Sequence, residues 1–483
     1  MTLEIIMLVA FAAFLTLILL EVPVGLAIAL SGILGVALQT GMPVADRVLA
    51  TTPYSGSAKY SLVVIPMYIL LGTLIANSGL GAGIYRAVNR VVVRLPGGLA
   101  VAAVTATALF SGISGSSAAD VATFGRISVN EMTRHGYSKS YAAAVVAAAG
   151  TFAALIPPSV TLVIYAIIAE QSIAAMIVAG IVPGVASAVC LASFLVVRAW
   201  TGPSEMGGRR GAGPVAASMA TALEEARVGA SQRTGARGSS GRSSPSLDDP
   251  NEKMLRRRAN RADAMSVVYA GVIFLIVVGG LYGGVFTATE SGAMGAFAAA
   301  VIGLVAHRSR TTISLRELLR SSLHETASVT SMIFLLLIGG AIFSYFVASS
   351  GMPRALMSWT ATLDVPPMMV VALFLIVLLV LGMFLDGLSM LVLTVPLIAP
   401  VVEGLGFDGV WFGILVLKTI EIGLITPPVG INAFIISGIV NVPVVQVFKR
   451  LVPFVILDLA VTAAFFAFPD LILWLPRLAG LQP

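Results

Sequence analysis

The sequence predicts an all-α polytopic membrane protein, because its composition is strongly apolar and its apolar residues occur in long runs. Of the 483 residues, 58% are hydrophobic and 11% are charged, whereas soluble domains carry about 25% charged residues. Many runs reach about 20 residues, the length of a helix that spans a bilayer. The first run, residues 5–38, is too long for a signal peptide and lacks a basic start. We expect it to form two spans, separated near the sequence EVPVG.

The charged residues and the cysteine content limit the possible partners. The net charge is +6, but the basic residues cluster where cytoplasmic loops are expected. The sequence therefore predicts contact with membrane lipid and no nucleic-acid partner. Cys190 is the only cysteine, so no disulfide can form within the chain.

A polar segment at residues 201–262 divides the chain into two halves, residues 1–200 and residues 263–483. It is rich in Gly, Ser, Ala and Arg and lacks the apolar residues of a core, which predicts a disordered linker. Its basic end precedes a new span, so we expect the linker to be cytoplasmic. That basic run could also bind lipid headgroups or a partner, but a role in setting the topology is favoured.

Each half contains an apolar stretch that a short polar segment interrupts. The first is a predicted re-entrant hairpin at about 95–135, with the sequence SGISGSSAAD (111–120) at its tip. The second is a predicted hairpin at about 366–405, interrupted by FLDGLSM (384–390). The distribution of basic and acidic residues around them predicts entry from opposite faces of the membrane.

A membrane-length run with a central Pro-Pro pair follows each hairpin. These runs are residues 140–168 and residues 410–439. Proline removes a backbone donor, and an interrupted helix survives in a membrane only inside protein or beside a cavity. Two hairpins and two broken helices predict two inverted repeats, the design of secondary transporters that bind substrate near the bilayer midplane.

The first tip supplies candidate cation ligands and a candidate anion site. The hydroxyls of Ser114, Ser116 and Ser117 and the unwound backbone offer hard oxygen ligands that suit Na⁺, while the helix ends favour an anion. The alternative is that these small residues only permit close helix packing. The two broken helices favour the functional interpretation.

Intramembrane acids are functional candidates. Asp120 follows the first tip and Asp386 the second; each could be functional or could cap the returning helix. Glu421 could coordinate a cation, carry protons or pair with Lys418.

Other polar residues flank the two proline pairs. Ser159 and Thr161 flank the first pair, while the oxygens of Thr426, Gly430 and Asn432 could complete a second cation site. Arg126 could contact a substrate carboxylate, although a cytoplasmic anchor is favoured.

Two segments of the second half have simpler expected roles. Glu290 is expected to cap the helix that follows it. Residues 311–325 place Leu at helical spacing between charges, which predicts an interfacial amphipathic helix.

The motifs of common enzymes are absent from the sequence. The sequence GISG (112–115) is similar to that of intramembrane serine proteases, but its serine would need a base. The three histidines, His135, His307 and His324, all fall at expected cytoplasmic turns. No Walker A or HExxH sequence is present. We therefore predict no enzymatic activity. A channel stays possible, but the paired hairpins favour alternating access.

Five ordered stretches resemble the large membrane subunit of the TRAP (tripartite ATP-independent periplasmic) transporters, a DctM-like permease. They are GISGSSAAD, AAAGTFAALIPPS, ATESGAMGA, GMFLDGLSMLVLTVPLIAP and GLITPPVGIN. The resemblance implies a multi-pass protein of the bacterial inner membrane that takes up an organic acid, such as a C4-dicarboxylate or sialic acid. It implies symport with Na⁺, an elevator mechanism, a small four-helix membrane subunit and a periplasmic substrate-binding protein.

The resemblance also assigns site residues. The first Na⁺ site would combine Ser114, Gly115, Ser116 and Ser117 with Gly150 and Pro157. The second would combine Asp386, Gly387 and Ser389 with Gly423, Thr426 and Gly430. The substrate would lie between the tips, with Ser116, Asp120, Arg126, Ser159, Thr426 and Asn432 as candidate contacts. The long linker departs from the family pattern, and the small subunit is expected to be a separate chain. The alternative function is a carboxylate/cation symporter that needs no binding protein.

Overall fold

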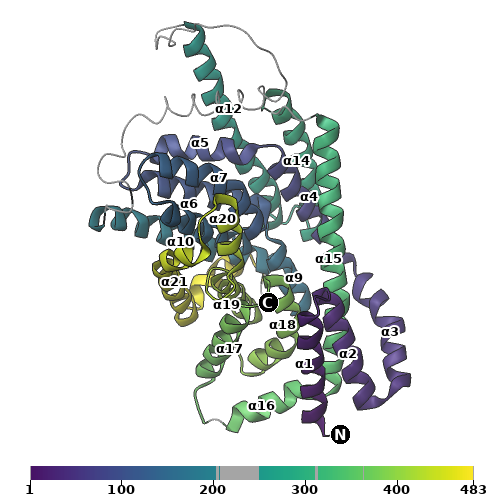
Figure 1. The fold of residues 1–483 in the computed structure, drawn as a ribbon. Coiled ribbons are helices and arrows are strands. Elements are labelled where there is room, and N and C mark those ends of the chain that lie inside the picture. The colour runs from purple at the N-terminus through teal and green to yellow at the C-terminus, as the bar shows by residue number, and fades with distance from the viewer. Residues whose placement is uncertain (1, 203–205, 207–249, 311–313, 363, 482–483) are drawn as a thin grey trace.

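The computed structural model describes residues 2–202, 206, 250–310, 314–362 and 364–481, which form helices and short connections (Figure 1). Seven helices in these ranges are long and apolar enough to cross a membrane. Over the same ranges, the only β-type pairing is an isolated bridge between Tyr137 and Met206. The prediction of an all-α polytopic membrane protein is confirmed.

The first half contains ten α-helices and two 3-10 segments among the described residues. Their bounds are α1 Leu3–Leu19, α2 Val24–Thr40, α3 Met42–Ser57, η1 Tyr60–Val63, α4 Val64–Asn77, α5 Leu80–Val92, α6 Gly98–Ser114, α7 Ser117–Arg134, α8 Lys139–Ala149, η2 Gly150–Ala154, α9 Val160–Ile168 and α10 Ile173–Thr201. The run at 5–38 forms two helices, α1 and α2, as the sequence predicts.

The second half has a similar order of elements. Their bounds are α12 Pro250–Phe274, a π-turn at Leu275–Gly279, α13 Gly280–Tyr282, α14 Ala288–Arg310, α15 Leu315–Ser349, α16 Met352–Thr362, α17 Pro367–Gly382, α18 Gly387–Gly404, α19 Gly409–Gly423, α20 Ile431–Val440, α21 Val444–Ala467 and α22 Asp470–Leu478. In each half a short helix (α5 or α16) precedes a helix pair (α6–α7 or α17–α18) and an interrupted helix (α8–α9 or α19–α20). The inverted relation between the halves stays a prediction.

The helices pack into two groups. The first, which we call the wall, comprises α1–α4, α14 and α15, with close contacts of α2 with α15 and of α4 with α14 (Figure 1). Glycines allow this packing, because a Cβ built on Gly339 would lie only 2.1 Å from the carbonyl oxygen of Gly25. The second group, the hairpin body, comprises α6–α10 and α17–α22. Every residue of α19 is buried within it.

Helix α15 corrects one prediction. Residues 315–325 do not form a separate interfacial helix but are the first turns of a continuous 35-residue helix. Their polar face packs against α4: Thr326 lies 3.0 Å from Thr73 between hydroxyl oxygens, and Asn77 donates to Ser322 at 3.1 Å. The buried polar side of this segment therefore belongs to a helix–helix interface, whereas Leu315, Leu319 and Leu323 stay exposed.

Glu290 caps α14 as expected. The carboxylate of Glu290 accepts from the main-chain N–H of Thr287 at 2.8 Å, and the Thr287 hydroxyl accepts from the N–H of Glu290 at 3.3 Å. This reciprocal pair is a capping box.

The predicted linker at 201–262 lies partly outside the described residues, which omit 203–205 and 207–249. Residues 250–262, predicted to be part of the disordered linker, belong instead to helix α12. Directly after this segment, the buried carboxylate of Asp263 binds Arg86 and Arg90 and so anchors α12 to α5. Met206 is also part of the core and packs against Tyr141.

Candidate substrate and cation site

The first tip is the sharp turn between α6 and α7. Gly115 adopts φ +61° there, and a Cβ on it would lie 3.1 Å from the carbonyl oxygen of Pro158. Glycine thus serves both the backbone conformation and the close approach to the first broken helix. The hydroxyl of Ser116 caps α7 by accepting from the N–H of Ala119 at 3.4 Å.

Asp120 ties the two arms of the first hairpin together. It is fully buried, and its carboxylate accepts hydrogen bonds from the hydroxyls of Ser111 and Ser114 on α6. The helix cap is Ser116, so Asp120 is not the capping residue. Its carboxylate points back into the hairpin, toward the two α6 hydroxyls.

The first broken helix opens between α8 and α9. Its 3-10 turn begins at Gly150, where a Cβ would lie 2.5 Å from Val121 of α7 and 3.6 Å from the amide nitrogen of Asn432. The hydroxyl of Ser159 donates to the carbonyl of Ala154 at 2.9 Å and lies 2.7 Å from the Thr161 hydroxyl. Ser159 therefore stabilises the interruption itself. Its side chain is buried, and it is not among the residues that line the cavity between the tips.

The second tip joins α17 to α18. Asp386 caps α18 by accepting from the N–H of Ser389 at 3.1 Å, and the Ser389 hydroxyl also donates to its carboxylate. Both Asp386 and Gly387 line the cavity. Asp386 therefore caps the returning helix, which is one of the two roles suggested for it. It also lines the cavity, so the functional role stays possible.

The second broken helix opens between α19 and α20. A Cβ on Gly423 would lie 2.6 Å from the carbonyl carbon of Gly382, so the two backbones touch. The Thr426 hydroxyl donates to the carbonyl of Ile422 at 2.6 Å, and Gly430 adopts φ +56°. The N–H of Asn432 reaches back to the carbonyl of Leu424 at 3.0 Å and anchors the start of α20.

Both tips, both broken helices and the wall enclose a cavity of about 320 Å³, which we call the central cavity. Its polar lining comes from segments that are far apart in the sequence. The polar residues and glycines that line it are Gly72, Thr73, Ser114, Gly115, Ser116, Ser117, Thr161, Glu325, Asp386, Gly387, Glu421 and Asn432.

Glu421 connects the two halves across this cavity. It is almost fully buried, and both of its carboxylate oxygens accept from the hydroxyl of Ser117, at 2.8 Å each. Lys418 forms its ion pair with Asp458 of α21 rather than with Glu421. Of the three roles suggested for Glu421, direct pairing with Lys418 is therefore wrong.

The lining contains three carboxyl groups and no basic side chain among the described residues. Glu325, Asp386 and Glu421 contribute carboxylates, and no Lys, Arg or His is among the described lining residues. Asn432 adds a buried amide whose nitrogen has no hydrogen-bond partner. The described ranges bring no three His, Cys, Asp or Glu side chains together as a metal site. Cation ligands in this cavity would therefore include hydroxyl, amide and carbonyl oxygens.

Some predicted site residues lie away from the cavity, and some of its residues were not predicted. Arg126 is exposed on α7, and Pro157, Gly150, Gly423, Thr426 and Gly430 support the breaks from behind the lining. Glu325 and Thr73, which face the tips from the wall, were missed. The sequence did offer a signal for them, because an ionisable residue such as Glu325 at the start of an apolar helix is a functional candidate.

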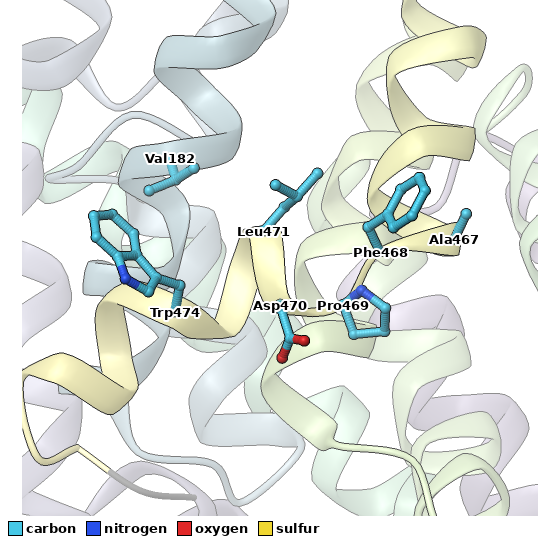
Figure 2. A pocket seen from close by; sticks show the side chains of 7 residues that line it. All are labelled: Val182, Ala467, Phe468, Pro469, Asp470, Leu471 and Trp474. Carbon is cyan, nitrogen blue, oxygen red and sulfur yellow. The ribbon is translucent and has the colours of Figure 1, made fainter.

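A second hollow, of about 600 Å³, lies among α10, α21 and α22 (Figure 2). Its walls are apolar except for Asp470, which pairs with Arg477 at 2.6 Å. No residue of either tip lines it. It lacks the convergent polar groups of a site for a charged solute, so the central cavity is the candidate site.

Comparisons with known proteins agree on one family. The family model for the "Tripartite ATP-independent periplasmic transporter, DctM component" matches residues 11–471. The chain is 28% identical over 453 residues to the "C4-dicarboxylate TRAP transporter large permease protein DctM" of Pseudomonas aeruginosa, covering 94% of each chain. It is 26% identical to the "Sialic acid TRAP transporter large permease protein SiaM" of Vibrio cholerae, covering 88% of each.

A solved structure also shares the fold. The YdaH transporter of Alcanivorax borkumensis superposes with a TM-score of 0.56 over 89% of each chain, at 13% sequence identity. The family match confirms the prediction of a transporter rather than an enzyme. Because the family model covers nearly the whole chain, this protein belongs to the tripartite ATP-independent periplasmic transporters and is a large permease of the DctM type.

Proposed function

We propose that this permease imports an organic acid together with Na⁺ across the bacterial inner membrane. It would act with a small four-helix membrane subunit and a periplasmic substrate-binding protein. The observation that carries the proposal is the central cavity, where both tips and both broken helices meet the wall around three carboxylates without a basic side chain.

The charge of the cavity supports coupling to a cation. A carboxylate substrate would add negative charge beside Glu421 and Asp386, and Coulomb repulsion is strong where water is excluded. Bound cations would offset that repulsion, so acid and cation would bind together. This mutual dependence is the thermodynamic basis of symport.

The oxygen atoms near the tips suit Na⁺ as the transported cation. At the first tip the candidates are the oxygens of Ser114, Gly115, Ser116 and Ser117, close to the carbonyls of the first break. At the second tip they are those of Asp386, Gly387 and Ser389, close to the break at residues 423–430. Hydroxyls, carbonyls and carboxylates are hard ligands of the kind that alkali cations prefer.

The substrate class follows from the relatives and from the free donors of the cavity. The two relatives carry a C4-dicarboxylate and sialic acid in their names, and both are carboxylates. The unpartnered amide nitrogen of Asn432 and the exposed hydroxyl of Ser116 could donate to a substrate carboxylate. Asp120, Arg126, Ser159 and Thr426 do not line the cavity, so we no longer propose them as substrate contacts.

The division into wall and hairpin body supports an elevator movement. Both tips and both breaks belong to the hairpin body, whereas α4 and α15 face them from the wall. A body that carries the site past a fixed wall would expose it to each side of the membrane in turn.

Uptake into proteoliposomes tests the proposal. The permease would be reconstituted with its small subunit, and labelled C4-dicarboxylate or sialic acid would be offered with and without the binding protein and an inward Na⁺ gradient. Uptake that needs both the gradient and the binding protein is the expected result. Uptake without the binding protein would favour a simpler carboxylate symporter. Uptake that ignores the Na⁺ gradient would contradict Na⁺ coupling.

A further inference from the structure

Helix α5, the short helix before the first hairpin, is joined to α12 by an ionic contact with a buried carboxylate. Arg86 of α5 donates to one carboxylate oxygen of Asp263 through Nε at 3.0 Å and through Nη2 at 2.8 Å. Arg90, one turn further along α5, donates to the other oxygen. Asp263 is only 3% exposed. Because both oxygens of Asp263 are used and its carboxylate is shielded from water, this contact is more specific than a surface ion pair.

The contact links two helices that lead into the two groups. Helix α5 leads directly into the first hairpin and packs on α6 and α7. Helix α12 leads through the π-turn to α14, which packs on α4 of the wall. Arg86, Arg90 and Asp263 therefore connect α5, which precedes the first hairpin, to α12, which packs on α14 of the wall and also on α6 of the hairpin body.

The corresponding place in the second half has no such contact. Helix α16 precedes the second hairpin as α5 precedes the first, and it lies at the opposite end of the molecule (Figure 1). Among the described residues it packs on α15 and α18 and makes at most a marginal contact with α1. Both ends therefore join the hairpin body to the wall, but among the described residues only the α5 end does so through a buried ion pair.

We propose that Asp263 is a latch that holds the hairpin body at the α12 end of its movement. The proposal rests on the elevator movement described above, because it assigns this structure to one of the two end states. In the other state the contact would be broken, and both guanidinium groups could be hydrated. The strength of the latch would then set the fraction of molecules in each state.

Distances measured by electron paramagnetic resonance test the latch. Spin labels at Val91→Cys on α5 and Val268→Cys on α12 would report the separation, because both side chains are exposed. Cys190→Ser would remove the native thiol. Asp263→Asn removes charge-assisted hydrogen bonds. We therefore expect the population with a longer distance between α5 and α12 to rise about tenfold or more relative to the population with the short distance. Arg90→Gln keeps the Arg86 pair and should give a smaller shift in the same direction.

A matched control is available on α22. Asp470→Asn breaks another Asp–Arg pair, with Arg477 at 2.6 Å, at an exposed position away from α5. It should leave the distance distribution unchanged. An unchanged distribution in both Asp263→Asn and Arg90→Gln would overturn the latch.

Crosslinking gives a second, functional test. A short thiol-reactive crosslinker between Arg86→Cys and Asp263→Cys should stop uptake, and reduction should restore it. The matched pair is Gln171→Cys with Glu403→Cys, because these side chains meet at 2.8 Å within the hairpin body. That crosslink should be tolerated. Uptake that persists with α5 and α12 crosslinked would overturn the latch. If the protein without any crosslink shows no Na⁺-driven uptake, the proposed function is contradicted instead.

Discussion

The hydroxyl of Ser117 donates to both carboxylate oxygens of Glu421, although the two residues are 304 positions apart in the sequence. One belongs to the first tip and the other to the second broken helix. This contact brings together parts of the two halves that each contribute to the central cavity, so a change at either residue should be felt at the whole site.

We expect Ser116→Ala combined with Ser117→Ala to weaken Na⁺ dependence without unfolding the protein. The double variant removes two hydroxyl oxygens that could bind Na⁺. It also removes the hydrogen-bond donor to the buried carboxylate of Glu421, and loss of that donor costs about 1–3 kcal/mol. The Na⁺ concentration for half-maximal uptake should rise by about tenfold, the equivalent of 1.4 kcal/mol. Ser172→Ala is the control, because that serine also caps a helix, at 3.2 Å from Ala175 N, but lies outside the cavity. Unchanged Na⁺ affinity in the double variant would count against a cation site at the tip.

Gly423→Ala should impair uptake while the protein still reaches the membrane. Its new methyl group would meet the Gly382 backbone at 2.6 Å and push the second hairpin away from the second break. Overpacking of this kind costs about 1–3 kcal/mol. Gly438→Ala, in the following helix α20, meets nothing within 4 Å and serves as the control. Wild-type uptake by Gly423→Ala would show that the contact between these backbones is not required for the site.

Lys418→Met should destabilise the protein strongly. Lys418 is fully buried and pairs with Asp458, and removal of one partner of a buried pair costs about 3–5 kcal/mol. Combining it with Asp458→Leu should restore much of the loss, because no unpaired charge would then remain. Apparent melting temperatures in detergent, compared at one heating rate, would measure both effects. A single variant as stable as the wild type would contradict the buried pair.

Deletion of residues 208–248 should spare uptake, provided that Met206 is kept. Met206 is 5% exposed and packs beside Tyr137 and Tyr141. Met206→Asp should therefore lower the apparent melting temperature, since it would bury an unpaired charge. Loss of uptake in a deletion variant that inserts normally would show that the deleted residues do more than connect the halves.

The sequence was a good guide wherever local chemistry decides the structure. Proline pairs, glycines with positive φ and capping residues act within a few positions of the chain, so the breaks, the tips and the Glu290 cap could be located in advance. The packing partner of a polar helix face was not predictable in this way. Residues 315–325 suit a membrane surface and a helix interface equally well, and the contact of Ser322 with Asn77 of α4 depends on how distant helices pack.

The composition and the motifs by themselves determined a polytopic helical transporter with a polar site at two interrupted segments. The tertiary structure alone decided which polar residues meet. It paired Glu421 with Ser117 rather than with Lys418, placed Glu325 at the cavity and left Arg126 outside it. The physical reason is that helical periodicity specifies the direction of a side chain on its own helix, whereas the partner across an interface depends on how distant segments pack.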